Sequence, residues 1–152
     1  MSPRRTRIAK VITLREKALD QRVAKLSDQR AAEARALSAE EQKKQEVELA
    51  SESRLKMAED GGAVTAGSWI EANEWLVSRQ KQLEHARLEA ARAQLETKKA
   101  QGAVMTARSD LKKVELLSGR IEQQERSDAN VAERRLEDEL SQMRFRRNED
   151  RK

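Results

Sequence analysis

A short glycine-containing interruption, residues 60–68, separates two long segments that each have a helical pattern. It reads D-G-G-A-V-T-A-G-S and contains three of the five glycines in the chain. Gly61 and Gly62 are suited to end a helix, because glycine readily adopts the left-handed conformation that a helix C-cap needs. Ser68 is suited to start the next helix, because its hydroxyl and the Glu71 carboxylate match the S-x-x-E capping box. Together these signals predict a helical hairpin that folds back at this point.

The predicted organisation is a single all-α domain in which two long helices form an antiparallel coiled-coil hairpin, with the second helix longer. The expected boundaries are a basic head at 1–7, a first helix at 8–60, a turn at 61–67, a second helix at 68–147 and a tail at 148–152. Ser2 and Pro3 could serve as the N-cap and first residue of the first helix, and a frayed end is the alternative. The basic head is either a solvated end or a contact for an acidic partner.

Composition supports long helices and argues against a thick hydrophobic core. Charged residues make up 39% of the chain and hydrophobic residues 37%, with two Trp, one Phe and no Tyr. Such a composition is typical of coiled coils. Disorder also accompanies high charge, but disordered chains lack the apolar periodicity that is present here.

The second segment contains a strict seven-residue repeat. Its two columns are Trp69, Leu76, Leu83, Ala90, Thr97, Val104 and Leu111, and Ala72, Arg79, Ala86, Ala93, Ala100, Ala107, Val114 and Ile121. A heptad repeat sustained over this length indicates a left-handed supercoil with a partner helix. The Ala-rich middle predicts a close approach of the two helices there.

The first segment has a more diluted apolar face. Its apolar residues are spaced by sums of three and four, as one helix face requires; they are Ile8, Ile12, Leu19, Val23, Leu26, Leu37, Val47 and Leu55. A fold about residue 65 matches the two faces by placing Leu26 opposite Val104 and Val47 opposite Leu83. In that register the first helix ends its pairing near residues 121–127, and the second helix continues alone.

The unpaired end of the second helix is predicted to present an apolar stripe. Ala132, Leu136, Leu140 and Met143 follow each other at helical spacing, and nothing else in the chain is left to cover them. An apolar stripe on a single helix implies a partner or local disorder. Both this end and the head are basic.

The sequence contains no catalytic constellation, and we expect no cofactor and no metal site. His85 is the only histidine and cysteine is absent, which excludes His-based triads, multi-His metal sites within one chain and thiol chemistry. The glycine segment lacks the G-x-x-x-x-G-K-[ST] spacing of a phosphate-binding loop. No apolar run approaches the length of a membrane-spanning helix, and the basic N-terminus lacks the apolar stretch of a secretory signal. The absence of cysteine suits a reducing compartment.

The two tryptophans lie close to the turn. Trp69 belongs to the first heptad column and is expected to cap the hairpin core. Trp75 lies beside Leu76 and has two possible roles. It either packs on the flank of the first helix near Leu55 or serves as an aromatic anchor for a partner, since Trp is enriched in binding hot spots.

Several stretches of the chain resemble the FliJ/YscO-like proteins. The run W-I-E-A-N-E-W-L-V-S-R-Q-K-Q-L-E-H-A-R at 69–87 resembles the start of that family's second helix. There, an aromatic–Ile pair and a second aromatic six residues on precede a Q/R-x-x-L-E pattern. The stretch A-E-R-R-L-E-D-E-L-S-Q-M at 132–143 and the opening R-I-A-K-V-I-T-L-R-E resemble the injectisome YscO branch, which is therefore favoured over the flagellar one.

The resemblance implies a non-enzymatic central stalk of a type III secretion export ATPase, with a fold similar to the coiled coil of the rotary ATPase γ subunit. It implies that the termini end of the hairpin enters the ATPase hexamer. The ring-binding residues are then expected to be Ala132, Leu136, Leu140, Met143, Arg144, Arg147, Arg4 and Arg5.

The resemblance also implies that the part near the turn faces the export gate and that secretion chaperones are partners. The gate-facing residues are then Trp75, Arg79, Gln82 and Ala86, although the family's pattern favours apolar residues at several of these positions. We expect a monomer located in the cytoplasm, peripheral to the inner-membrane export apparatus and not inserted into the membrane.

Two other functions remain open. A nucleic-acid-binding arm could use the basic ends, but the net charge of +5 is modest, acids are interleaved with the cations and aromatic stacking platforms are missing. A passive spacer or homo-oligomeric coiled coil could instead pair the terminal stripe with itself.

Overall fold

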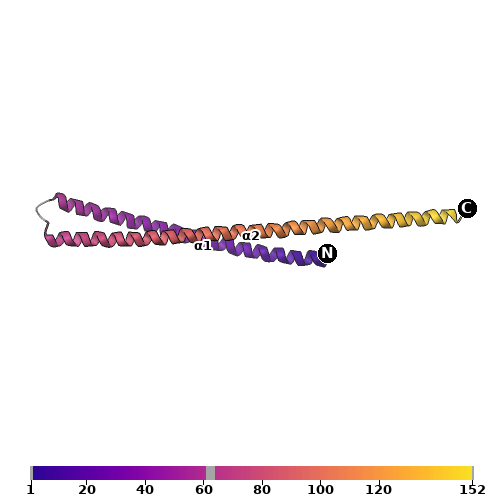
Figure 1. Cartoon of the computed structure of the whole chain (residues 1–152), viewed down its shortest axis with the longest axis horizontal. Coiled ribbons are helices and arrows are strands. Elements are labelled where there is room, and N and C mark those ends of the chain that lie inside the picture. The colour runs from indigo at the N-terminus through magenta and orange to yellow at the C-terminus, as the bar shows by residue number, and fades with distance from the viewer. Residues whose placement is uncertain (1, 61–63, 152) are drawn as a thin grey trace. The chain divides into compact units, whose positions relative to one another are not determined.

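The computed structural model describes residues 2–60 and 64–151, which form two helices, α1 (Pro3–Glu59) and α2 (Ala66–Glu149) (Figure 1). The helices contain 57 and 84 residues. They pack antiparallel, since Glu46 of α1 pairs with Arg79 and Glu40 pairs with Arg87. The predicted fold class, an antiparallel pair of helices with the second one longer, is confirmed.

The chain divides into two compact units, and each contains a part of both helices. We call Asp20–Thr106 the turn unit, and Met1–Leu19 with Ala107–Lys152 the terminal unit.

The N-terminus of α1 is capped by a side chain. α1 begins at Pro3 and not at Ile8, so most of the predicted basic head is helical. The Ser2 hydroxyl accepts a hydrogen bond from the backbone N–H of Arg5 at 3.2 Å. Pro3 occupies the first helical position, where a missing N–H removes no intrahelical bond. Ser2 and Pro3 therefore take the N-cap and first positions.

The start of α2 differs from the prediction. α2 begins at Ala66, and the cap is Thr65, whose hydroxyl accepts a hydrogen bond from the backbone N–H of Ser68 at 3.1 Å. The expected capping box of Ser68 with Glu71 is wrong, because Ser68 already lies in the first turn of α2. Threonine is itself a favourable N-cap. The expected C-cap at Gly61 and Gly62 lies outside the described residues.

The core of the turn unit follows the heptad columns of α2. Its buried residues on α2 are Leu76, Leu83, Ala90, Thr97 and Val104 from the first column and Ala100 from the second. On α1 the buried residue is Ala50. The heptad prediction for α2 is therefore confirmed, and we call these two columns the seam.

The apolar face predicted for α1 is only partly right. Val23, Leu37 and Leu55 are exposed, with Leu55 at 61%. Glu40 and Lys43, in contrast, are half-buried and pair with α2. Long charged side chains can lay their methylene groups along an Ala-rich helix while the charged ends stay in water. Apolar residues alone therefore do not mark the packed face of α1.

The pairing is shifted by about one helical turn from the predicted register. Lys43 Nζ donates a hydrogen bond to Gln82 Oε1 at 3.2 Å, and the Thr97 hydroxyl lies 3.4 Å from the carbonyl oxygen of Gln29. Both α1 partners precede the positions that the predicted register assigns by about one turn of helix. Alanines in the middle of the α2 seam offer few large side chains to fix a register, so apolar matching alone left it ambiguous.

In the terminal unit, ion pairs join the start of α1 to α2. Arg5 pairs with Glu122 at 2.9 Å and with Glu125 at 3.1 Å, and the Ser2 hydroxyl donates to Glu125. Beyond Glu125, every residue from Arg126 to Arg151 is exposed. We call residues 126–151 the free end of α2.

Two glycines inside α2 give a stability prediction. A Cβ built on Gly102 or Gly119 would have no neighbouring atom within 4 Å, so neither glycine is needed for close packing. Gly102→Ala and Gly119→Ala should each raise the free energy of unfolding by about 1 kcal/mol, the difference between alanine and glycine in a helix interior. Urea unfolding followed by circular dichroism measures this. A loss of stability at either position would show that the glycine has a packing role.

Candidate partner-binding sites

The first candidate site is the apolar stripe on the free end of α2. Leu136, Leu140 and Met143 are 59%, 52% and 65% exposed, and Ala132 is also exposed. The intervals of four, four and three residues place these side chains on one face of the helix. A single helix that exposes such a row lacks the second surface that would bury it. This arrangement matches the sequence prediction of an uncovered stripe.

From Glu137 to Arg147 the free end changes from acidic to basic, and Arg134 and Arg135 precede this stretch. Glu137, Asp138 and Glu139 lie between the apolar residues, whereas Arg144, Arg146 and Arg147 follow Met143. All are exposed. A partner that buries the stripe therefore meets an acidic segment followed by a basic one, which can fix its orientation, because electrostatic complementarity sets register more than affinity.

Arg4 and Arg5 of the N-terminal head differ in their surroundings. Arg5 is half-buried and bound to Glu122 and Glu125, so its charge is directed at α2. Arg4 is exposed. Of the two arginines expected at a partner surface, Arg4 presents its charge to solvent and Arg5 holds the start of α1 on α2.

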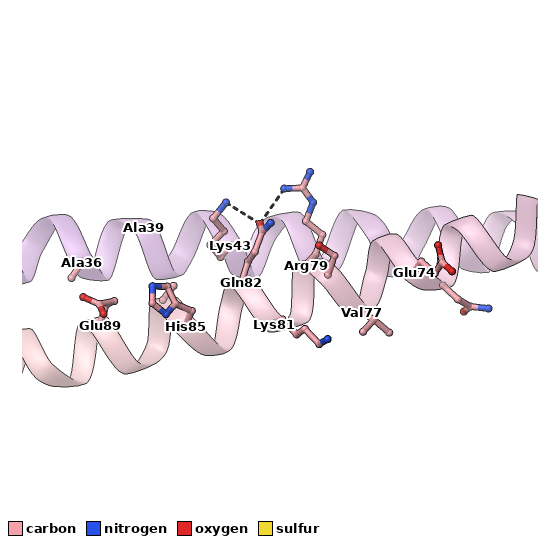
Figure 2. A pocket seen from close by; sticks show the side chains of 13 residues that line it. Ala36, Ala39, Lys43, Glu74, Val77, Arg79, Lys81, Gln82, His85 and Glu89 are labelled. Atoms are coloured by element: carbon pink, nitrogen blue, oxygen red, sulfur yellow. Dashed lines mark hydrogen bonds between the residues drawn. The ribbon is translucent and has the colours of Figure 1, made fainter.

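The second candidate site is a cluster around Trp75 in the turn unit. The Arg79 guanidinium lies over the Trp75 ring, 5.3 Å from Cζ to the ring centroid. Arg79 Nη1 also donates hydrogen bonds to Glu46 Oε2 at 2.8 Å and to Gln82 Oε1 at 3.3 Å. Figure 2 shows Lys43 and Arg79 both donating to Gln82. Three of the four predicted gate-facing residues are thus brought together, and Ala86 lies on the seam one turn further along α2.

Trp75 combines exposure with a fixed position. The side chain is 45% exposed, and Arg79, which is only 29% exposed, stacks on one of its faces. Leu55, the predicted packing partner, is 61% exposed, and Arg79 covers one face of the Trp75 ring. Cation–π contacts contribute about 0.5–1 kcal/mol at exposed sites. Arg79 therefore covers one face of the ring, and much of the rest of its surface stays accessible.

Sequence reasoning missed the α1 half of this cluster. Glu46 accepts hydrogen bonds from Arg79 and from Lys43, the latter at 3.3 Å. Neither α1 residue is apolar, so a pattern of apolar residues does not include them. With the correct register, the opposite charges of Glu46 and Arg79 would have been the signal.

A hollow beside this cluster is not a small-molecule pocket. It is open to solvent and is lined by Ala36, Ala39 and Lys43 of α1 and by residues of α2 that include Val77, Arg79, His85 and Glu89. Val77 and Arg79 point in directions about 160° apart around the helix axis, so one small ligand cannot contact both. Within residues 2–60 and 64–151, no group of acidic, His or Cys side chains is placed to bind a metal ion. Within the same residues, neither helix contains a stretch that could cross a bilayer.

Comparison with known proteins identifies one family. The family model described as "Flagellar FliJ protein" matches residues 4–150 of the chain, a range that includes both candidate sites. No curated protein and no solved structure matches the chain.

Proposed function

The chain belongs to the FliJ family, whose members are non-enzymatic stalk proteins, and we propose that it is the central stalk of a type III export ATPase. The observation that supports this role most strongly is the free end of α2. It is a single helix up to Glu149, every residue from Arg126 to Arg151 is exposed, and an apolar row runs along one face. A stalk needs such an end, because it must present its own surface to a ring of surrounding subunits.

We propose that the free end enters the ATPase hexamer and buries its apolar row there. Full burial of a Leu or Met side chain contributes about 1.5–3 kcal/mol, so Leu136, Leu140 and Met143 together can support a specific interaction. Arg144 and Arg147 extend the same end with positive charge, and Arg4 adds an exposed cation at the start of α1. These groups suit acidic or carbonyl-rich surfaces of the ring. Purified chain added to purified ATPase should therefore accelerate ATP hydrolysis.

We further propose that the Trp75 cluster contacts the export gate. Polar residues at 79 and 82 depart from the family's preference for apolar side chains there, and in this chain Arg79 instead fixes the Trp75 ring by stacking. Trp75 is then the anchor, and Arg79 and Gln82 position it or bind polar groups of the gate. Ala86 extends this surface along α2. Secretion chaperones are further partners that family membership suggests, and the proposed location is the cytoplasmic side of the inner-membrane export apparatus.

Trp75→Ala should weaken binding of the full chain to the purified cytoplasmic domain of the gate protein by about tenfold or more, since truncating a hot-spot Trp typically costs at least 2 kcal/mol. Arg79→Ala should weaken this binding less, because the Trp75 ring remains and loses only the Arg79 guanidinium that stacks on it. Isothermal titration calorimetry measures both. Val77→Ala is the matched control, since Val77 is 48% exposed and lies in the same unit. If Trp75→Ala and the unmodified chain bind the gate domain equally well, the proposal that the Trp75 cluster contacts the gate is wrong.

The secretion system that the chain serves is proposed separately. The tail motif at 132–143 favours an injectisome, whereas the family description that matches is flagellar. We propose the injectisome on the basis of this motif. The genes adjacent to the coding sequence test this assignment. Flagellar genes next to it would assign the chain to the flagellum and not to an injectisome.

A further inference from the structure

The face of α2 opposite the seam carries a second apolar row within the turn unit. We call it the outer stripe; it consists of Leu88, Ala91, Leu95, Gly102 and Met105. Leu88, Leu95 and Met105 are 59%, 57% and 71% exposed, and the other two are also exposed. The intervals of three, four, seven and three residues keep these side chains on one helix face. Lys98 lies on the same face and interrupts the row between Leu95 and Gly102. Figure 2 shows Val77 and Lys81, which occupy the same heptad columns nearer the turn, pointing away from α1.

The hairpin itself does not use the outer stripe. All the buried residues of α2 belong to the two seam columns, and α1 packs on that side. Gly102 is informative here, because a Cβ built on it would meet nothing within 4 Å. Glycine destabilises a helix interior relative to alanine, and packing against α1 does not explain its presence. Between Leu95 and Met105 it adds no side chain to the surface of α2.

The stripe lies in a positively charged strip of surface. From residue 87 to residue 105, the heptad columns of the stripe and the two columns beside it contain four cations, Arg87, Arg92, Lys98 and Lys99, and no acidic residue. Such a sign bias beside an apolar row favours a partner of opposite charge.

Glu89 and Glu96, one column further round the helix, pair only weakly with Arg92 and Lys99. Arg87 pairs with Glu40 of α1 at 3.9 Å, and Glu84 lies in the column of Ala91, one turn before Leu88. Glu89 lies 3.4 Å from Arg92 and Glu96 lies 3.2 Å from Lys99, and the two cations are 74% and 75% exposed. Ion pairs at such exposure contribute little. Arg92 and Lys99 are therefore free to turn towards a partner that lies on the stripe.

We propose that the outer stripe binds an amphipathic helix of another protein, one whose apolar row is flanked by Glu and Asp residues. A helix fits because the row has helical spacing and, at about 1.5 Å per residue, extends over several turns. Apolar residues at such spacing are how a helix presents anchors to another helix. A second copy of this chain does not fit, because pairing two stripes would bring two cationic borders together. The row has no Trp or Phe, and only Leu88, Leu95 and Met105 are large. It therefore offers a membrane surface little apolar area to bury.

This proposal goes beyond the stalk function and does not depend on it. The outer stripe includes no residue of the free end and none of the Trp75 cluster. Binding can therefore be measured with the full chain alone, in the absence of ATPase and gate.

Two synthetic helical peptides with the same Leu and Ala row provide the test. One has Glu at every position beside the row and the other has Lys, and both are followed by fluorescence anisotropy with the full chain. We expect the Glu peptide to bind at least ten times more tightly than the Lys peptide, with an affinity that falls as salt increases. Leu95→Asp should weaken its binding at least tenfold. Leu49→Asp, a matched control on α1 where Leu49 is 61% exposed, should leave it unchanged.

A charge-reversal variant separates the recognition of acids from general stickiness. Arg92→Glu with Lys99→Glu should reverse the preference, so that the Lys peptide binds more tightly than the Glu peptide. Equal affinities for the two peptides, or Glu-peptide binding that survives Leu95→Asp, would overturn the proposal. Leu95-dependent binding to anionic vesicles without peptide binding would also overturn it, because the stripe would then bind a membrane. Leu95-dependent dimerisation in sedimentation equilibrium would overturn it as well. Leu95→Asp should leave stimulation of the ATPase intact in every case, so the stalk function is tested independently.

Discussion

Replacement of Leu136 and Leu140 together by Asp should abolish stimulation of the export ATPase, while the helical content measured by circular dichroism stays nearly unchanged. Both side chains are more than half exposed, so neither contributes to the core of the hairpin. In the ring each would leave water, and a carboxylate in its place would be desolvated without a partner, which costs several kcal/mol. The double variant should therefore reduce stimulation to the level of ATPase alone.

The matched control for this experiment changes two leucines of similar exposure that lie outside the free end. Leu14 and Leu116, 65% and 58% exposed, belong to the terminal unit, and Leu14→Asp with Leu116→Asp adds the same charge as the test variant. Stimulation by this control should remain close to that of the unmodified chain. If the control and the test variant lose stimulation equally, net charge and not the stripe determines the effect.

If the test variant still stimulates the ATPase, the proposal that the free end inserts into the ring is wrong. The alternative of a homo-oligomeric spacer would then gain support if the unmodified chain forms dimers and the variant with Leu136→Asp and Leu140→Asp is a monomer. Sedimentation equilibrium of the unmodified chain separates the cases, because a stalk that acts as one copy should remain a monomer. Loss of stimulation together with a monomeric state supports the ring interaction.

The fold was predictable from α2 because its sequence repeats strictly. Leu76, Leu83 and Val104 recur at multiples of seven residues and all are buried, so a pattern read from the sequence alone identified the packed face. The uncovered end followed from the unequal lengths of the two segments and did not need an accurate register. An error of about one turn in the register moves the last paired residue of α2 by only about four positions. The start of the free end is therefore predictable even with an inaccurate register.

The face of α1 could not be read from apolar residues, because its packed positions include charged side chains. Glu40 and Lys43 are half-buried, whereas Leu49 and Leu55 on the same helix are both 61% exposed. Against an alanine-rich partner helix, the stems of Glu and Lys supply apolar contact while their charges reach solvent. The same property hid the Glu46–Arg79 pair and so the α1 half of the Trp75 cluster.

The helix starts show a second limit of local sequence signals. Ser68 with Glu71 matches a capping box, and Thr65, three residues earlier, is also able to cap a helix. The capping box is the more specific pattern, so it gave the prediction. In the structure the Thr65 hydroxyl accepts from Ser68 N–H, which lengthens α2 towards the turn. A local motif therefore identifies residues able to cap a helix but not which of them does.

Leu76→Asp should lower the free energy of unfolding by about 3–5 kcal/mol, the range for core substitutions that remove a large side chain and bury an unpaired charge. Leu76 is 7% exposed, and the pairing of Glu46 with Arg79 places it close to Ala50, the buried residue of α1. Leu88→Asp introduces the same charge at a position that is 59% exposed and should change stability by no more than about 0.5 kcal/mol. Urea unfolding followed by circular dichroism measures both variants. If Leu76→Asp does not unfold the chain at lower urea than Leu88→Asp, the heptad seam is not the packed face and the antiparallel pairing built on it is wrong. Leu76→Ala, which removes only apolar contact, should lie between them at about 2–4 kcal/mol, and it keeps the comparison measurable if the Asp variant does not fold.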